Sequence, residues 1–69
     1  MQVKSEMSAT VWKVLVQAGD KVEPGTELTI LESMKMEIPV ESETAGIVTE
    51  ILVEEGQSID EGDVIAVIE

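Results

Sequence analysis

Cysteine and histidine are absent from this 69-residue chain, and its only aromatic side chain is Trp12. Without cysteine no disulfide can form, and without histidine the commonest metal ligand is missing. The chain therefore has neither a thiol nucleophile nor an imidazole base. A domain of this length buries only about 60% of the surface that its unfolded chain exposes. Its stability must come from its plentiful valine, isoleucine and leucine side chains.

Positive charge is also scarce, because four lysines stand against fifteen acids and give a net charge of −11 at pH 7. Such a charge repels phosphate backbones and anionic lipid headgroups, so we predict binding to neither nucleic acid nor membranes. No apolar run approaches the roughly 20 residues that span a bilayer, and the N-terminal residues lack the apolar core of a signal peptide. We therefore expect a cytoplasmic location.

The acids are spread along the chain and do not match the spacing of a calcium-binding loop. We read most of them as a solvated face, and we expect no metal site and no catalytic residue. The chain is predicted to act without catalysing a reaction by itself. Its negative charge also opposes self-association, so we expect a monomer.

An internal repeat is the most informative feature of the sequence. Residues 10–32 align on residues 47–69 without a gap, at an offset of 37. Both copies keep two glycines six residues apart, Gly19 with Gly25 and Gly56 with Gly62. Identical residues at the aligned positions are Val11/Val48, Leu15/Leu52, Val16/Val53, Gly19/Gly56, Gly25/Gly62 and Glu32/Glu69. We predict two similar halves related by an approximate two-fold axis.

Each copy is predicted to contain a strand, a turn, a short extended stretch, a second turn and a second strand. The β-branched runs at 11–16 and 48–53 are too short for confident helices. Gly19 and Gly56 end these runs, where a turn needs positive φ. Lys13 falls in register with Val11 and Leu15, so we expect a bulge or strong twist in the first strand. In the second strand, the two-residue period places Leu28 and Ile30 on one face.

The fold class that follows is all-β. Two such halves indicate a sandwich or flattened barrel with internal pseudo-two-fold symmetry. We expect one domain over residues 1–69, with repeat halves 10–32 and 47–69 around a hairpin at 33–37.

That hairpin lies in the segment that the repeat leaves out. An extended run at 36–41 follows the strand that ends at Glu32, with Lys35 near the tip and Ile38 and Val40 pointing inward. Pro39 requires an edge or non-bonded position. Met34 and Met36 flank the lysine, either as an exposed, polarizable patch that another protein reads, or as filling for the end of the barrel beside a solvated turn charge.

The sequence Glu32-Ser33-Met34-Lys35-Met36-Glu37 resembles the Ala-Met-Lys-Met signature of the biotinyl and lipoyl attachment domains. The resemblance extends over nearly the whole chain, including the glycine-containing turns of both copies. It implies two four-stranded antiparallel sheets, with Lys35 on the exposed turn at one end and both termini at the other. It further implies covalent biotin on Lys35, with Met34, Met36, Glu32 and Glu37 recognised by biotin protein ligase.

Because the match covers nearly the whole chain, the resemblance is closest to the free-standing biotin/lipoyl attachment proteins. It implies a carrier subunit that moves a carboxyl group on a swinging arm between biotin carboxylase and carboxyltransferase. Ser33 replaces the usual alanine, and Ser8-Ala9 stands where relatives often have Pro-Gly. No insertion resembles the protruding thumb of some carriers, so biotin is expected to lie free of protein contacts. The alternatives are a lipoyl carrier modified at Lys35 and an unmodified β module that binds a protein partner.

Overall fold

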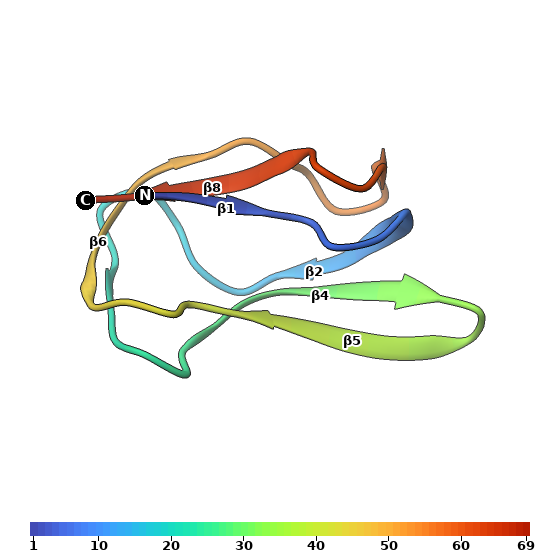
Figure 1. The fold of residues 1–69 in the computed structure, drawn as a ribbon, viewed down its shortest axis with the longest axis horizontal. Coiled ribbons are helices and arrows are strands. Elements are labelled where there is room, and N and C mark those ends of the chain that lie inside the picture. The colour runs from blue at the N-terminus through green and yellow to red at the C-terminus, as the bar shows by residue number, and fades with distance from the viewer.

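Eight antiparallel strands form two four-stranded sheets in the computed structural model, which describes all residues from 1 to 69. One sheet has the order β1-β8-β6-β3 and the other β5-β4-β2-β7, as Figure 1 shows in part. The strands are β1 (Gln2–Lys4), β2 (Ala9–Val14), β3 (Lys21–Val22), β4 (Glu27–Ser33), β5 (Met36–Glu41), β6 (Gly46–Ile51), β7 (Ser58–Ile59) and β8 (Val64–Ile68). The predicted fold class is confirmed. No helix of the length and apolarity needed to cross a membrane occurs.

The two halves are interlocked by hydrogen bonds that repeat at the offset seen in the sequence. The amide of Gly19 donates to the carbonyl of Val48 at 2.6 Å, and the amide of Gly56 donates to the carbonyl of Val11 at 2.7 Å. Each bond joins a turn of one copy to a strand of the other. The pseudo-two-fold relation is therefore present in the structure, and each half contributes a strand to the sheet of the other half.

The structure extends this symmetry beyond the repeat that the sequence revealed. The Ser5 hydroxyl accepts a hydrogen bond from the amide of Met7 at 3.3 Å, and the Ser42 hydroxyl accepts one from Thr44 at the same distance. Both serines are buried and lie in the loops that enter β2 and β6. These loops thus follow the same path in the two halves.

The hydrophobic side chains that form the core between the sheets are all aliphatic. None of its members is aromatic, so the core depends on close packing of branched side chains, each contributing about 1.5–3 kcal/mol when fully buried. The core residues are Val3, Val11, Val16, Val22, Leu28, Leu31, Val48, Val53, Ile59, Ile65, Ala66 and Ile68.

A bulge in β2 explains why its hydrophobic pattern is irregular. The register with β4 shifts between Val11 and Lys13, so Trp12 is the additional residue. Val11 is consequently buried while Lys13 is exposed, and its ammonium lies 5.5 Å from the centre of the Trp12 ring. β6 has the equivalent shift, between Val48 and Glu50. The sequence-based expectation of a bulge is confirmed.

In β4 the simple two-residue alternation is wrong. Leu28 and Leu31 are buried, but Ile30 is half-buried. The cause is a second register shift, between Glu27 and Thr29 in the pairing of β4 with β5. An extra residue in one strand reverses the face of everything beyond it. Thr29 thereby enters the core, a position that the sequence pattern did not assign to it.

The chain ends and the β4–β5 hairpin lie at opposite ends of the molecule (Figure 1). Met1 and Ile68 close the terminal end, because the amide of Ile68 donates to the carbonyl of Met1 at 2.8 Å. The pseudo-two-fold axis relates this end to the hairpin end. The β4–β5 turn lies at the end opposite the termini, and the molecule is 31 Å long.

Candidate functional site at the β4–β5 hairpin

A two-residue turn made of Met34 and Lys35 joins β4 to β5. Ser33 pairs with Met36 as the last rung of the ladder, so no further residue is available for the loop. Both turn residues have positive φ, 53° at Met34 and 65° at Lys35. Two-residue hairpin turns whose twist matches that of the strands need positive φ at both positions, which usually selects Asn-Gly. Here a methionine and a lysine adopt it.

This backbone conformation opposes the preference of both side chains. The left-handed region costs an L-residue other than glycine about 1–2 kcal/mol. Met34 and Lys35 are the only non-glycine residues with positive φ in the chain. Residues held in such regions concentrate at functional sites. Met34 and Lys35 therefore occupy the turn at a cost in stability.

The two methionines are exposed. Met34 is 89% exposed and Met36 is 57% exposed. Neither belongs to the core between the sheets. The interpretation in which these side chains fill the end of the barrel is therefore wrong, because the two-residue turn carries them past the last core layer. What remains is an exposed apolar pair on either side of Lys35.

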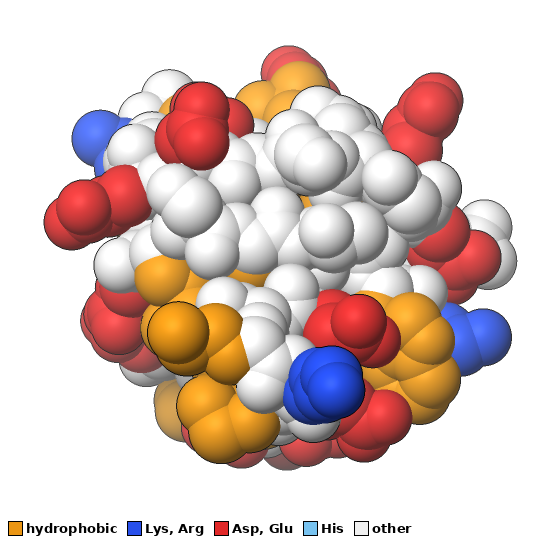
Figure 2. All heavy atoms as spheres, turned by 90° about the vertical axis from the view of Figure 1, so that its right-hand side faces the viewer, with side chains coloured by type: hydrophobic (Ala, Val, Ile, Leu, Met, Phe, Trp, Pro, Cys, Tyr) orange, Lys and Arg blue, Asp and Glu red, His pale blue; other side chains and the backbone are white.

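Lys35 is also exposed, but so are Lys4, Lys13 and Lys21. Exposure alone does not distinguish it. The other three lysines lie within strands, where Lys13 is placed over the Trp12 ring. Lys35 alone occupies a turn, at the end opposite the termini. Figure 2 views this end, where hydrophobic side chains and lysines reach the surface among carboxylates.

Glu32 and Glu37 face each other one rung below the closing pair. Both side chains are exposed. Because side chains alternate along a strand, these two carboxylates share one face of the hairpin, and Ser33 and Met36 share the other. Two like charges in directly opposed positions are destabilising. The hairpin end therefore combines a cation, two apolar side chains and two nearby carboxylates.

Below this tip the hairpin joins a third strand, β2. Leu31 is buried and pairs with Ile38, while Glu32 also pairs with Thr10 of β2. Ser33 pairs with Met36 and has no partner on β2. The tip therefore projects one rung beyond the three-stranded part of the sheet. Lys35 is thereby exposed to solvent at the tip of a hairpin whose base is paired with β2.

The sequence profile of a family described as "Biotin-requiring enzyme" matches residues 1–68. The chain belongs to the biotin/lipoyl attachment domain family. This membership confirms the resemblance seen in the sequence, and it makes biotin the group that the family implies. An exposed primary amine on a solvent-facing turn fits such a group, because amide formation needs an acceptor nitrogen that another protein can reach.

Curated relatives share this character by name. The "Biotin/lipoyl attachment protein" of Bacillus subtilis is 58% identical over 40 residues, which are 58% of this chain and 55% of that protein. The "Biotinylated protein TB7.3" of Mycobacterium tuberculosis is 50% identical over 38 residues, 55% of this chain and 54% of that protein. The chain thus spans about half the length of the curated relatives it matches.

Solved structures place the same fold inside larger proteins. The urea carboxylase of Kluyveromyces lactis contains a part that superposes with a TM-score of 0.93 and 36% identity, covering all of this chain and 6% of that one. A single-chain, multi-domain long-chain acyl-CoA carboxylase gives a TM-score of 0.88 and 27% identity over 96% of this chain and 6% of that one. The attachment domain is similar to small parts of two carboxylases.

Sequence reasoning singled out the hairpin but missed two features. The positive φ at Met34 and Lys35 was not foreseen, although the absence of any spare residue between the two strands would have indicated it. The other omission is a cavity beside β5, which Met7 and Val40 help to line. No sequence signal marks that cavity, because its walls come from segments distant in the chain. No group of three or more acidic side chains able to hold a metal ion occurs.

Proposed function

We propose that Lys35 carries biotin through an amide at Nζ and that the chain is a non-catalytic carrier of carboxyl groups. Its partners are a biotin protein ligase, a biotin carboxylase and a carboxyltransferase. The observation that supports this most directly is the placement of Lys35 on a strained two-residue turn, at the end of the molecule farthest from the termini. Membership of a biotin-requiring family supports the choice of group.

The attachment step needs little from the chain itself. The ligase supplies biotin as an acyl-adenylate, and the uncharged Lys35 amine attacks the acyl carbon. A C–N bond forms, the bond from the acyl carbon to the AMP oxygen breaks, and a base on the ligase takes the proton from Nζ. Lys35 must therefore be reachable and held in place, which the hairpin provides.

Met34 and Met36 are the side chains with which we expect the ligase to distinguish Lys35 from the other exposed lysines. Unbranched thioether side chains adapt to the surface that meets them, which suits them to recognition. Glu32 and Glu37 add two carboxylates on one face of the same hairpin. Together these four residues surround the acceptor with a pattern that no other lysine of the chain has.

After attachment, the chain's contribution is mechanical. Biotin supplies a ureido nitrogen that accepts and releases a carboxyl group. Lys35 adds its four-carbon stem to the arm, and the hairpin base, which is paired with β2, limits the volume that the arm explores. Tethering raises the effective concentration of the arm at each partner's site. The similarity to parts of two carboxylases supports partners of this kind.

The proposal is tested by expressing the chain with a biotin protein ligase and excess biotin and then measuring its intact mass. We expect one biotinyl increment, present in a Lys13→Arg control and absent from Lys35→Arg. Lys13 is the matched control because it is also exposed and lies in β2, in the sheet that carries the hairpin.

Labelling that persists in Lys35→Arg would overturn the assignment. A parallel expression with a lipoate ligase and lipoate decides the alternative group, since a lipoyl increment at Lys35 in preference to biotin would make the chain a lipoyl carrier. A chain that remains unmodified by both enzymes would favour the unmodified β module.

A further inference from the structure

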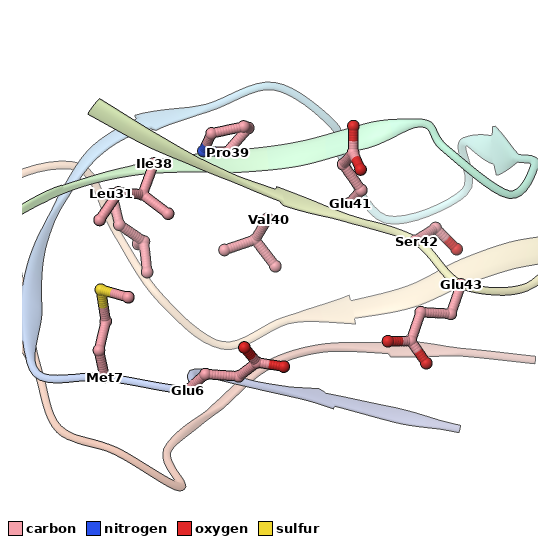
Figure 3. A pocket seen from close by; sticks show the side chains of 9 residues that line it. All are labelled: Glu6, Met7, Leu31, Ile38, Pro39, Val40, Glu41, Ser42 and Glu43. Atoms are coloured by element: carbon pink, nitrogen blue, oxygen red, sulfur yellow. The ribbon is translucent and has the colours of Figure 1, made fainter. Parts of the chain in front are cut away.

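The four methionines of the chain differ in how far their side chains are open to solvent. Met34 is 89% exposed, Met36 is 57% exposed and Met1, at the opposite end of the molecule, is 52% exposed. Met7 is half-buried and lines a cavity of about 230 Å³ beside β5, together with Leu31 (Figure 3). The methionine in the β4–β5 turn is therefore the most accessible of the four.

The geometry of the hairpin explains why its two methionines are so exposed. Met34 lies in the two-residue turn, so it has no cross-strand partner, and its φ is 53°. Met36 pairs with Ser33 in the last rung and is the less exposed of the two. Neither side chain belongs to the core between the sheets. A chemical change at either sulfur therefore leaves the packing of the core intact.

An exposed thioether reacts with peroxides, and the product is methionine sulfoxide. With hydrogen peroxide, a lone pair of the sulfur attacks one oxygen, so that an S–O bond forms and the O–O bond breaks. The proton of the transferred hydroxyl passes to the departing hydroxide, which leaves as water. The sulfur loses two electrons and the peroxide gains them. Methionine sulfoxide reductases reverse the change with two electrons from thiols and release the oxygen as water.

The positions of Met34 and Met36 connect this chemistry to Lys35. One methionine precedes the lysine and the other follows it, so a ligase that takes up Lys35 covers both. As thioethers they offer apolar surface to that partner. A sulfoxide brings a polar acceptor into the same contact, and a buried acceptor without a hydrogen-bond partner opposes binding.

We propose that Met34 and Met36 are sites of reversible oxidation by peroxides, and that their sulfoxides withhold Lys35 from the biotin protein ligase. This inference rests on the proposed function. Oxidation acts on the chain before biotin is attached, and reduction makes Lys35 an acceptor again. A chain that already carries biotin keeps it, because oxidation of the methionine sulfurs does not break the amide at Nζ. The supply of newly biotinylated carrier thereby responds to peroxide.

The first measurement maps oxidation on the unmodified chain and needs no ligase. The chain is treated with hydrogen peroxide, catalase removes the excess, and peptide mass spectrometry follows the sulfoxide at each methionine. In proportion to their exposed fractions, we expect Met34 to oxidise about one and a half times as fast as Met36. Met7 should oxidise several-fold more slowly than either. Oxidation of Met7 at the rate of Met34 would overturn the assignment.

The second measurement follows biotinylation by intact mass, at a peroxide dose that leaves Met7 reduced. The treated chain should be biotinylated about ten-fold more slowly than the untreated chain, because one unpaired acceptor in a contact has an effect of that order. Methionine sulfoxide reductases should restore the original rate. The Tm should be the same before and after treatment, and slow labelling together with a lowered Tm would overturn the proposal.

Met34→Leu/Met36→Leu is the matched control, because leucine keeps both side chains apolar and cannot be oxidised. Met1 and Met7 remain in this variant. Each chain is compared with its own untreated sample, so a difference in the starting rate does not affect the comparison. We expect peroxide to leave the labelling rate of the variant unchanged. Equal slowing of the variant and the parent would locate the effect away from the hairpin and refute the inference.

The untreated parent chain separates this inference from the proposed function. If Lys35 is biotinylated as fast with Met34 and Met36 oxidised as with both reduced, the carrier function stands and the control by oxidation is refuted. If the ligase does not modify the untreated chain, the proposed function itself is refuted, and the control of Lys35 by oxidation is refuted with it.

Discussion

The hydroxyl of Thr29 is buried in the core without a hydrogen-bond partner. Its side chain is fully buried, yet its neighbours between the sheets are aliphatic. The pseudo-two-fold equivalent position holds Ala66, which is also fully buried and carries no polar atom. Leaving a buried hydroxyl unsatisfied costs about 1–3 kcal/mol relative to a satisfied one.

We therefore expect Thr29→Val to raise the free energy of unfolding. The substitution removes the unpaired oxygen and replaces it with a methyl group, whose burial contributes about 0.8 kcal/mol. Valine is β-branched like threonine, so the side chain loses no more rotamer freedom. A methyl group is slightly larger than a hydroxyl, and the tight core offsets part of the gain. The net expectation is a stabilisation of about 1–2 kcal/mol.

Urea and thermal unfolding measure this change directly. For a chain of this size, each 1 kcal/mol corresponds to a rise in Tm of about 4–8 °C. Thr29→Ser is the matched control, because it keeps the hydroxyl and removes the methyl group, and it should lower the stability. A Thr29→Val variant as stable as the parent, or less stable, would show that the hydroxyl is satisfied or that the core cannot accept the methyl group.

Three further substitutions test the turns and the chain ends. Gly46→Ala should lower the free energy of unfolding in urea by about 1–3 kcal/mol, since its Cβ would lie 2.7 Å from the Glu69 carbonyl oxygen. An unfolding curve that matches the parent's would mean that Glu69 shifts to accommodate the methyl group at no cost. Gly56→Val places a β-branched residue at φ 89° with open space around it, so we expect a loss of about 1–2 kcal/mol from the backbone alone, with Gly56→Asn losing less. Met34→Asn should raise the Tm, because asparagine tolerates positive φ, yet slow ligase-dependent biotinylation; faster labelling would indicate that the ligase does not read the methionine.

Much of the architecture was determined by the sequence because its two halves repeat. A glycine at the same place in each copy requires the same positive φ, and paired aliphatic runs require two sheets that bury one face each. Lys13 among Val11 and Leu15 indicated the bulge that the structure contains at Trp12. The segment outside the repeat marked Lys35 as singular, since local signals are sufficient to predict a hairpin between two extended runs.

Only the tertiary structure decided the features that depend on register and on segments distant in the chain. The shift beside Leu28 places Thr29 in the core and leaves Ile30 half-buried, and alternation along one strand cannot reveal it. The cavity beside β5 exists because the loop carrying Met7 lies against β5, about thirty residues away in sequence. Local propensity specifies strands and turns, whereas the packing of two sheets determines which side chains share a space.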